Sequence, residues 1–192
     1  MFSFEIDDEI ELRLHEQWHA EELFELIDDN REHLRPWFPW VEQTTEVADT
    51  RDFIRRAKQA YGERRGIPTS IWYRGQIAGT FGIGVQDIDW EVGSAEFGYW
   101  LGKRFEGKGI VTRSCESVVE YCFDTLELNR LVIRCTTENT RSRAVAERLD
   151  FVHEGTLRQS GKIQWRIGRH GCIRLFGGGT GVVTREHILD PR

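Results

Sequence analysis

The chain has 192 residues, 39% hydrophobic and 30% charged, which predicts one folded domain with at most a tail. A formal net charge of −6 argues against a nucleic-acid binder that works by neutralising phosphates. Neither a membrane-spanning apolar run nor a secretory signal pattern is present, and the four cysteines lack the CxxC spacing of a zinc site. We therefore expect a reduced, cytoplasmic protein without a metal and without nucleic-acid or membrane partners.

The first half of the chain combines strand and helix signals around a tight hairpin. In chain order we predict a strand at 10–14, a helix at 18–30, a bent aromatic segment at 34–40, a helix at 45–65, and strands at 70–74 and 76–83. The last two strands flank Gly75, which favours a short turn between them. His15 and His19 formally match H-E-x-x-H, but His15 directly follows a strand, so the two rings are not expected on one helix face and we discount zinc.

The second half continues this alternation and then changes in composition. We predict strands at 87–93 and 95–101, a glycine loop at 103–109, a helix at 110–126, a strand at 129–135, a helix at 140–150 and a strand at 151–157. From residue 160 onward, three consecutive glycines and dense arginine replace the clean periodicity. We therefore divide the chain into a domain at 1–160 and an aberrant tail at 161–192.

The most informative unit is a glycine loop between a strand and an amphipathic helix. Residues 104–109 follow an R-x-x-G-x-G pattern, and glycines there let the backbone approach a ligand closely. The helix that follows presents unpaired N–H groups and the positive end of its dipole, which suit a pyrophosphate, and Lys108 adds charge. An isolated G-x-G more often only turns the chain, so the surrounding sequence must decide between a simple turn and an anion-binding loop.

That context resembles a known family. The block AEFGYWLGKRFEGKGIVTRS, followed by LNRLVIRCTTENTRSRAVAERLDFVHEGTLRQ, resembles the GCN5-related N-acetyltransferase (GNAT) superfamily, and within it the group that acetylates N-terminal amines of ribosomal proteins. The segment HAEELFELIDDNREHLRPWFPWV resembles the opening helices of that group, so the likeness covers residues 8–160. It implies an α/β (α+β) fold whose mixed, mostly antiparallel twisted sheet is splayed at the cofactor site and carries helices on both faces. It also implies acetyl transfer from acetyl-CoA to a primary amine.

The resemblance further implies which residues hold acetyl-CoA. Main-chain amides of the loop would bind the pyrophosphate, the strand ending at Leu101 would run beside the pantetheine arm, and Asn139 and Ser142 match the family's N-x-x-S segment. The implied cofactor-binding residues are Tyr99, Trp100, Leu101, Arg104, Phe105, Glu106, Gly107, Lys108, Gly109, Ile110, Asn139 and Ser142.

Two residues are predicted to be catalytic. Ser142 would lie near the thioester sulfur and protonate the leaving thiolate, and its alternative role is a helix N-terminal cap. Glu96 could take a proton from the amine, or it could be a solvated strand carboxylate. Glu138 is more simply a solvated loop charge, and Cys135 a buried thiol rather than a nucleophile. A main-chain N–H of the strand at 99–101 would polarise the carbonyl oxygen.

The acceptor amine is predicted to be the N-terminal α-amine of a protein, with a ribosomal protein as the first expectation. Trp37 and Trp40 could line the acceptor cleft, or they could pack in the core. A small-amine or antibiotic acetyltransferase is one alternative, and an acyl-CoA-binding module without turnover is another. Dimers are common in the resembling group, so a homodimer stays an open expectation.

The tail departs from the family pattern. Related proteins continue after TLRQ with an acidic residue, an Asn-Gly turn and a last strand, whereas this chain has Gly161 and no recognisable strand. We hypothesise that a frameshift replaced that strand, because codons chosen for residues 161–172 can spell a family-like ending when read one nucleotide later. Loss of the strand would expose a sheet edge and remove a proposed base, so we predict impaired turnover beside retained cofactor binding.

Overall fold

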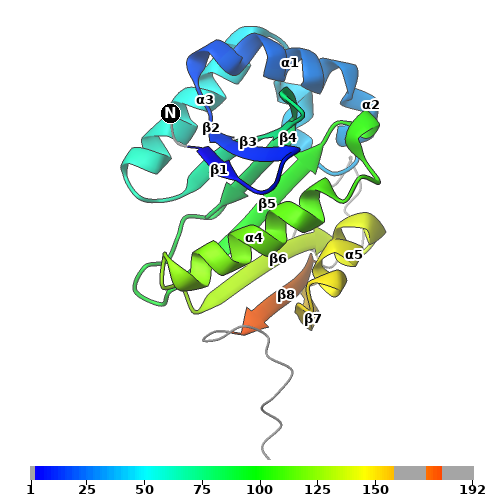
Figure 1. Ribbon diagram of the computed structural model, residues 1–192. Helices are drawn as coiled ribbons and strands as arrows, with labels where there is room; N and C mark the ends of the chain where they lie inside the picture. Colours follow the sequence, from blue (N-terminus) through cyan, green and yellow to red (C-terminus); the bar gives the residue numbers. More distant parts are fainter. Residues whose placement is uncertain (1–2, 158–171, 179–192) are drawn as a thin grey trace, which may run out of the picture.

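A single twisted sheet organises the computed structural model, which describes residues 3–157 and 172–178 (Figure 1). Its eight strands lie in the order β1-β2-β3-β4-β5-β6-β8-β7, and all neighbours are antiparallel except β5 and β6. The strands are β1 (Ser3–Glu5), β2 (Ile10–Leu14), β3 (Ile67–Tyr73), β4 (Gln76–Ile83), β5 (Ser94–Leu101), β6 (Arg130–Thr136), β7 (Val152–Leu157) and β8 (Cys172–Gly178). The predicted mixed, mostly antiparallel fold class is confirmed.

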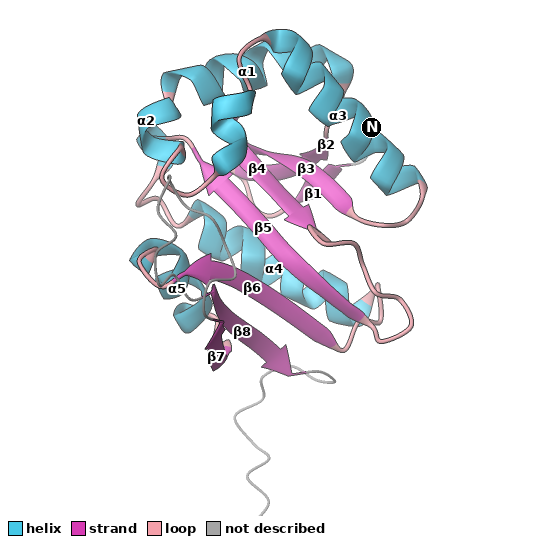
Figure 2. Ribbon diagram, turned by 180° about the vertical axis from the view of Figure 1, so that it is seen from behind, coloured by secondary structure: helices cyan, strands magenta, loops and turns pink. Residues whose placement is uncertain are grey.

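Helices cover both faces of the sheet, because each long helix has one apolar side to bury. The helices are η1 (Gln17–His19), α1 (Ala20–Asp29), α2 (Arg31–Leu34), η2 (Pro39–Gln43), α3 (Val47–Gly62), η3 (Lys103–Phe105), α4 (Ile110–Asp124) and α5 (Thr140–Arg148). Helix α4 crosses in front of the sheet in Figure 1 and behind it in Figure 2, which is the reverse view. In the part of the chain that the structure describes, no helix is both long and apolar enough to cross a membrane.

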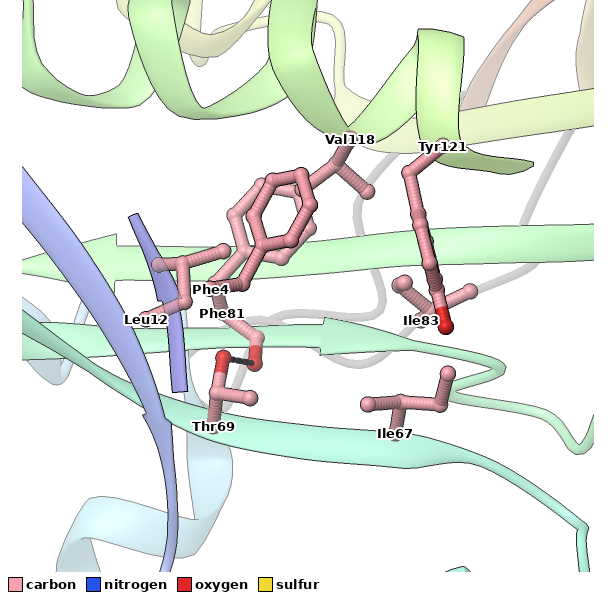
Figure 3. A pocket seen from close by; sticks show the side chains of 8 residues that line it. All are labelled: Phe4, Leu12, Ile67, Thr69, Phe81, Ile83, Val118 and Tyr121. Carbon is pink, nitrogen blue, oxygen red and sulfur yellow. Dashed lines mark hydrogen bonds between the residues drawn. The ribbon is translucent and has the colours of Figure 1, made fainter. Parts of the chain in front are cut away.

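The core between α4 and the sheet is apolar and nearly filled. The rings of Phe81 and Phe97 lie 5.3 Å apart there. A small apolar space of about 20 Å³, shown in Figure 3, remains beside them, and the Thr69 hydroxyl at its wall already donates to the Phe81 carbonyl at 2.8 Å. Its lining comprises Phe4, Leu12, Ile67, Thr69, Phe81, Ile83, Val118 and Tyr121. Such a space admits about one water molecule, so it is a packing gap and no ligand site.

The strand predicted at 87–93 is wrong. This segment is a loop whose only ladder contact among the described residues is a bridge between Asp89 and Ser94. The Asp89 carboxylate accepts hydrogen bonds from the N–H groups of Glu91 and Val92 at 3.1 and 2.9 Å. Local side-chain bonds of this kind compete with a strand ladder, so the alternating apolar pattern does not form one.

The sequence interpretation also missed strands β1 and β8. Strand β8 lies between β6 and β7 and is antiparallel to both, with the register Val132–Phe176 toward β6. The expectation that no strand follows residue 160 is therefore wrong. Pairing with two neighbours compensates for the low strand propensity of a glycine-containing segment, which a reading of local pattern does not detect. The frameshift hypothesis concerns residues 161–172, of which all but Cys172 lie outside the described part of the chain.

Candidate active site

Strand β5 has different neighbours along its two halves. The parallel ladder with β6 runs from Ser94–Arg130 to Phe97–Ile133. The antiparallel ladder with β4 begins at Phe97–Ile83 and continues to Leu101–Gly79. Beyond Phe97, the described ladders leave the edge of β5 toward β6 open, and Figure 2 shows the two strands diverging there. The splay expected from the resemblance is therefore present.

The direction of the peptide groups decides which residues present hydrogen-bonding groups at this open edge. Successive residues of a strand direct their N–H and C=O groups to opposite edges. The Trp100 carbonyl lies against Gly79 of β4, so close that a Cβ at that position would collide with it. Tyr99 and Leu101 consequently direct their peptide groups toward the open edge. The main chain of Trp100, a residue also predicted to bind the cofactor, faces β4.

The loop between β5 and α4 forms a cradle for an anion. Gly107 and Gly109 have φ values of 74° and 72°, a left-handed conformation that costs little only for glycine. The N–H groups of Phe105 and Glu106 donate to carbonyls within the turn at 2.9 and 3.2 Å. Within the described chain, the N–H groups of residues 107–112 have no main-chain acceptor, as expected at a helix start. The cradle therefore extends beyond the predicted loop to residues 111 and 112, which sequence reasoning missed.

The Glu106 side chain ties this loop to two helices. Its carboxylate accepts from the Arg141 guanidinium of α5 at 2.6 Å and lies 3.3 Å from Nε2 of His33 in α2. An acidic side chain beside an anion cradle would by itself repel the ligand. The Arg141 contact offsets that charge and positions α5 against the loop.

Helix α5 carries the predicted catalytic serine and its support. Asn139 is the N-terminal cap, and its Oδ1 accepts from the Ser142 N–H at 3.1 Å. The alternative that Ser142 is itself the cap is therefore wrong. Its Oγ lies 2.9 Å from the Tyr99 hydroxyl of β5, a bond that sequence reasoning missed. Burial raises the pKa of Tyr99, and Cys115 nearby adds to the effect, so this phenol stays protonated and able to donate.

The opposite face of β5 carries Glu96 and Trp100. The Trp100 ring packs on Trp40 of η2 with ring centroids 6.0 Å apart. Oε2 of Glu96 lies 3.2 Å from Nε of Arg134 in β6, so this carboxylate forms an ion pair across the diverging strands. Trp37 is half-buried in the turn after α2. The structure thus brings Glu96, Trp100 and Trp40 to one side of the splay.

The H-E-x-x-H histidines take part in separate contacts. Nδ1 of His15 lies 2.8 Å from the Ser70 hydroxyl, and Nδ1 of His19 accepts from the Glu16 N–H at 3.2 Å. Within residues 3–157 and 172–178, no three His, Cys, Asp or Glu side chains gather as a metal site would require.

Comparisons with known proteins agree with this geometry. Residues 9–152 match the family described as an acetyltransferase (GNAT) domain. The "Putative ribosomal N-acetyltransferase YdaF" of Bacillus subtilis (strain 168) is 37% identical over 159 residues, covering 82% of this chain and 86% of that protein. The "Ribosomal-protein-serine acetyltransferase" of Escherichia coli (strain K12) is 26% identical over 158 residues, covering 82% and 87%. The crystal structure of the microcin C7 self-immunity acetyltransferase MccE with acetyl-CoA and AMP has a TM-score of 0.85 and 28% identity, covering 90% of this chain and 94% of that one.

Proposed function

We propose that this chain, which belongs to the acetyltransferase (GNAT) domain family and is an acetyl-CoA-dependent N-acetyltransferase, acetylates the N-terminal α-amine of a protein. The observation that carries the proposal is the open edge of β5 beside the N–H groups of residues 107–112. Two relatives named as ribosomal acetyltransferases support a ribosomal protein as the acceptor.

The residues present fit acetyl-CoA at this site. The N–H groups of residues 107–112 would hold its pyrophosphate, since amides at a helix start bind phosphates well. The open edge at Tyr99 and Leu101 offers N–H and C=O partners to the amides of the pantetheine arm. The Asn139 side chain uses Oδ1 as a helix cap, which leaves its Nδ2 to donate to the same arm.

Acetyl-CoA supplies a thioester carbonyl that a neutral amine attacks. A main-chain N–H at the open edge, from Tyr99 or Leu101, would stabilise the negative charge that develops on the carbonyl oxygen. The Ser142 hydroxyl would donate a proton to the departing thiolate and be reprotonated by the proton that the attacking amine releases. The Tyr99 hydroxyl would stay protonated and orient Ser142 through their 2.9 Å bond. Holding both reactants in the splay supplies much of the remaining acceleration.

Glu96 has a more limited role in this proposal than that of a strong base. Its Oε2 already lies 3.2 Å from Nε of Arg134, so the carboxylate is held in an ion pair beside the splay. We assign it the orientation of the attacking amine through a hydrogen bond, with water taking the proton. The neighbouring rings of Trp40 and Trp100 would form the apolar wall that contacts the first side chain of the acceptor.

An acceptor panel tests this function. Release of free thiol from acetyl-CoA is measured with peptides that begin with serine or alanine, with the same peptides blocked at the α-amine, and with small polyamines. We expect release only with free peptide N-termini, and mass spectrometry should locate the acetyl group on the α-amine. Release with polyamines alone would replace the proposed acceptor class, and binding of CoA without any release would favour a module without turnover.

A further inference from the structure

A second concave site lies on the side of the glycine loop that faces the β3–β4 hairpin. Its cavity measures about 280 Å³. The lining residues are Tyr73, Arg74, Gln76, Arg104, Phe105 and Lys108. Three of these six side chains are cationic and none is acidic, so the cavity differs in character from the open edge of β5.

Two of the cations approach one aromatic ring. The Arg74 guanidinium lies 5.2 Å and the Lys108 ammonium 5.7 Å from the centre of the Tyr73 ring. The hairpin turn at Arg74 and Gly75, with φ values of 50° and 78°, directs Arg74 toward the loop. The fold therefore holds like charges near one another on a surface that is open to a ligand.

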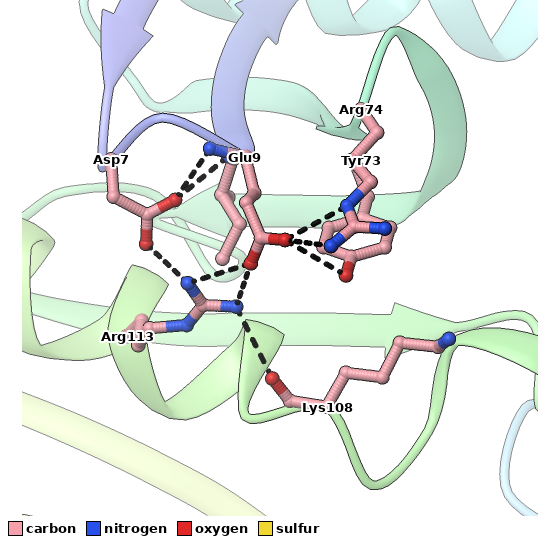
Figure 4. Close-up of polar contacts among 7 residues, drawn as sticks. Asp7, Glu9, Tyr73, Arg74, Lys108 and Arg113 are labelled. Atoms are coloured by element: carbon pink, nitrogen blue, oxygen red, sulfur yellow. Dashed lines mark hydrogen bonds and ion pairs between the residues drawn. The ribbon is translucent and has the colours of Figure 1, made fainter.

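A network of ion pairs fixes the wall of this cavity, as Figure 4 shows. Glu9 accepts from Nε of Arg74 at 2.8 Å and from Nη2 of Arg113 at 3.2 Å. Arg113 also pairs with Asp7 at 2.6 Å and donates to the Lys108 carbonyl at 3.2 Å. The hydrogen bonds to these guanidinium groups lower the pKa of Glu9, so the network stays charged and holds the hairpin beside the loop.

The network leaves a surplus of positive charge. Arg74, Arg104, Lys108 and Arg113 are cationic, and Asp7 and Glu9 are the two carboxylates that the structure pairs with them. Among the described residues, the side chains of Arg104 and Lys108 form no ion pair. A fixed cluster with uncompensated cations is suited to a doubly charged anion.

We propose that this cavity binds a phosphomonoester, held by Lys108, Arg104 and Arg74. A terminal phosphate carries a second negative charge that the diester linkage of a pyrophosphate lacks, and it presents three oxygens to the three cations. Such a phosphate could be the 3′-phosphate of CoA itself, in which case the inference rests on CoA binding at the adjacent cradle. It could equally be a separate phosphorylated small molecule that binds beside an occupied cradle.

The experiment compares CoA, 3′-dephospho-CoA and inorganic phosphate by calorimetry on the full-length protein. The variants are Lys108→Gln and Arg74→Gln, each of which keeps the loop amides. The matched control is Lys103→Gln, which removes an exposed cation from the same loop but outside the cavity. For the CoA source we expect the wild type to bind CoA about tenfold more tightly than 3′-dephospho-CoA, the size of one charge-assisted hydrogen bond. That preference should fall toward unity in both variants and persist in the control.

For a separate phosphate we expect CoA and 3′-dephospho-CoA to bind alike, while inorganic phosphate binds the CoA-saturated wild type and fails to bind Lys108→Gln. Either pattern supports the site. Equal binding of the two coenzymes together with no heat from phosphate overturns it. Failure of the cradle is distinguishable, because it would abolish the binding of both coenzymes in the wild type.

Discussion

The two edges of β5 serve different purposes. Toward β4, residues Phe97 to Leu101 form an antiparallel ladder, so the peptide groups on this edge bond within the protein. Toward β6, the described ladder ends at Phe97–Ile133, and the peptide groups of Tyr99 and Leu101 face the splay. Unpaired peptide groups are costly when buried, so an open stretch inside a sheet is retained where a ligand completes it. The difference between the edges separates what stabilises this fold from what carries its chemistry.

The largest expected effect comes from breaking the cradle beside the open edge. Gly107→Ala should weaken CoA binding by about 100-fold, or roughly 3 kcal/mol, the worth of two amide–phosphate hydrogen bonds. A Cβ at this position meets no atom within 4 Å, so the free protein is destabilised only by the strain of a left-handed alanine at φ 74°, about 1 kcal/mol. Calorimetry with CoA measures the binding, and urea unfolding measures the stability.

Gly75→Ala is the matched control for that variant. Gly75 also has a left-handed φ, 78°, and open space around an added Cβ, but it lies in the hairpin between β3 and β4. We expect a similar loss of stability and a far smaller loss of CoA affinity than in Gly107→Ala. Equal losses of CoA affinity in both variants would mean that backbone strain, and not the geometry of the cradle, controls binding.

Removing the Ser142 hydroxyl tests the proton donation to the thiolate at the open edge of β5. Ser142→Ala should lower kcat by about 100-fold, the lower range for a positioned acid, and leave the Kd of CoA nearly unchanged. Ser114→Ala is the control, because the Ser114 hydroxyl is buried in α4 and has no hydrogen-bond partner within the described residues. An unchanged kcat in Ser142→Ala would remove this residue from the mechanism.

Acidification should destabilise the strands on the β4 side of β5, where His15 after β2 contacts Ser70 of β3. Burial lowers the pKa of His15 to about 3, and the positive charge of His19 acts in the same direction. The unfolded chain takes up a proton on this ring below about pH 6.5, whereas the folded protein resists it. The contribution of the neutral His15 ring to the free energy of unfolding is therefore full above about pH 6.5 and decreases as the pH falls, by about 2 kcal/mol between pH 7 and 5.

Urea unfolding at the two pH values measures this loss. His15→Gln cannot titrate, so its free energy of unfolding should change less between pH 7 and 5 than that of the wild type. The lower stability of the variant at pH 7, from the lost contact with Ser70, does not affect this comparison of differences. Equal changes in the two proteins would show that His15 does not set the pH dependence.

The sequence predicted the parts of the site that depend on local pattern. Residues 107–109 could be assigned because glycine spacing before a helix is itself the signal for an anion cradle. The Tyr99–Ser142 bond joins residues 43 positions apart and depends on how α5 packs on β5, for which no local pattern exists. The Glu96–Arg134 pair likewise depends on the parallel register of β5 and β6, and strand β8 depends on partners on both sides.

The smallest expected effect separates two roles of Asn139, which caps α5 and is proposed to donate to the pantetheine arm at the open edge of β5. Asn139→Ala removes the cap of α5 and should cost about 1 kcal/mol of unfolding free energy. Asn139→Asp keeps a good cap but lacks the Nδ2 donor proposed for the pantetheine arm. We expect Asn139→Asp to retain stability and still raise the KM for acetyl-CoA, because the two atoms of this amide face different partners. If Asn139→Asp restores both quantities, the side chain serves only α5, and the open edge binds the arm through main-chain groups alone.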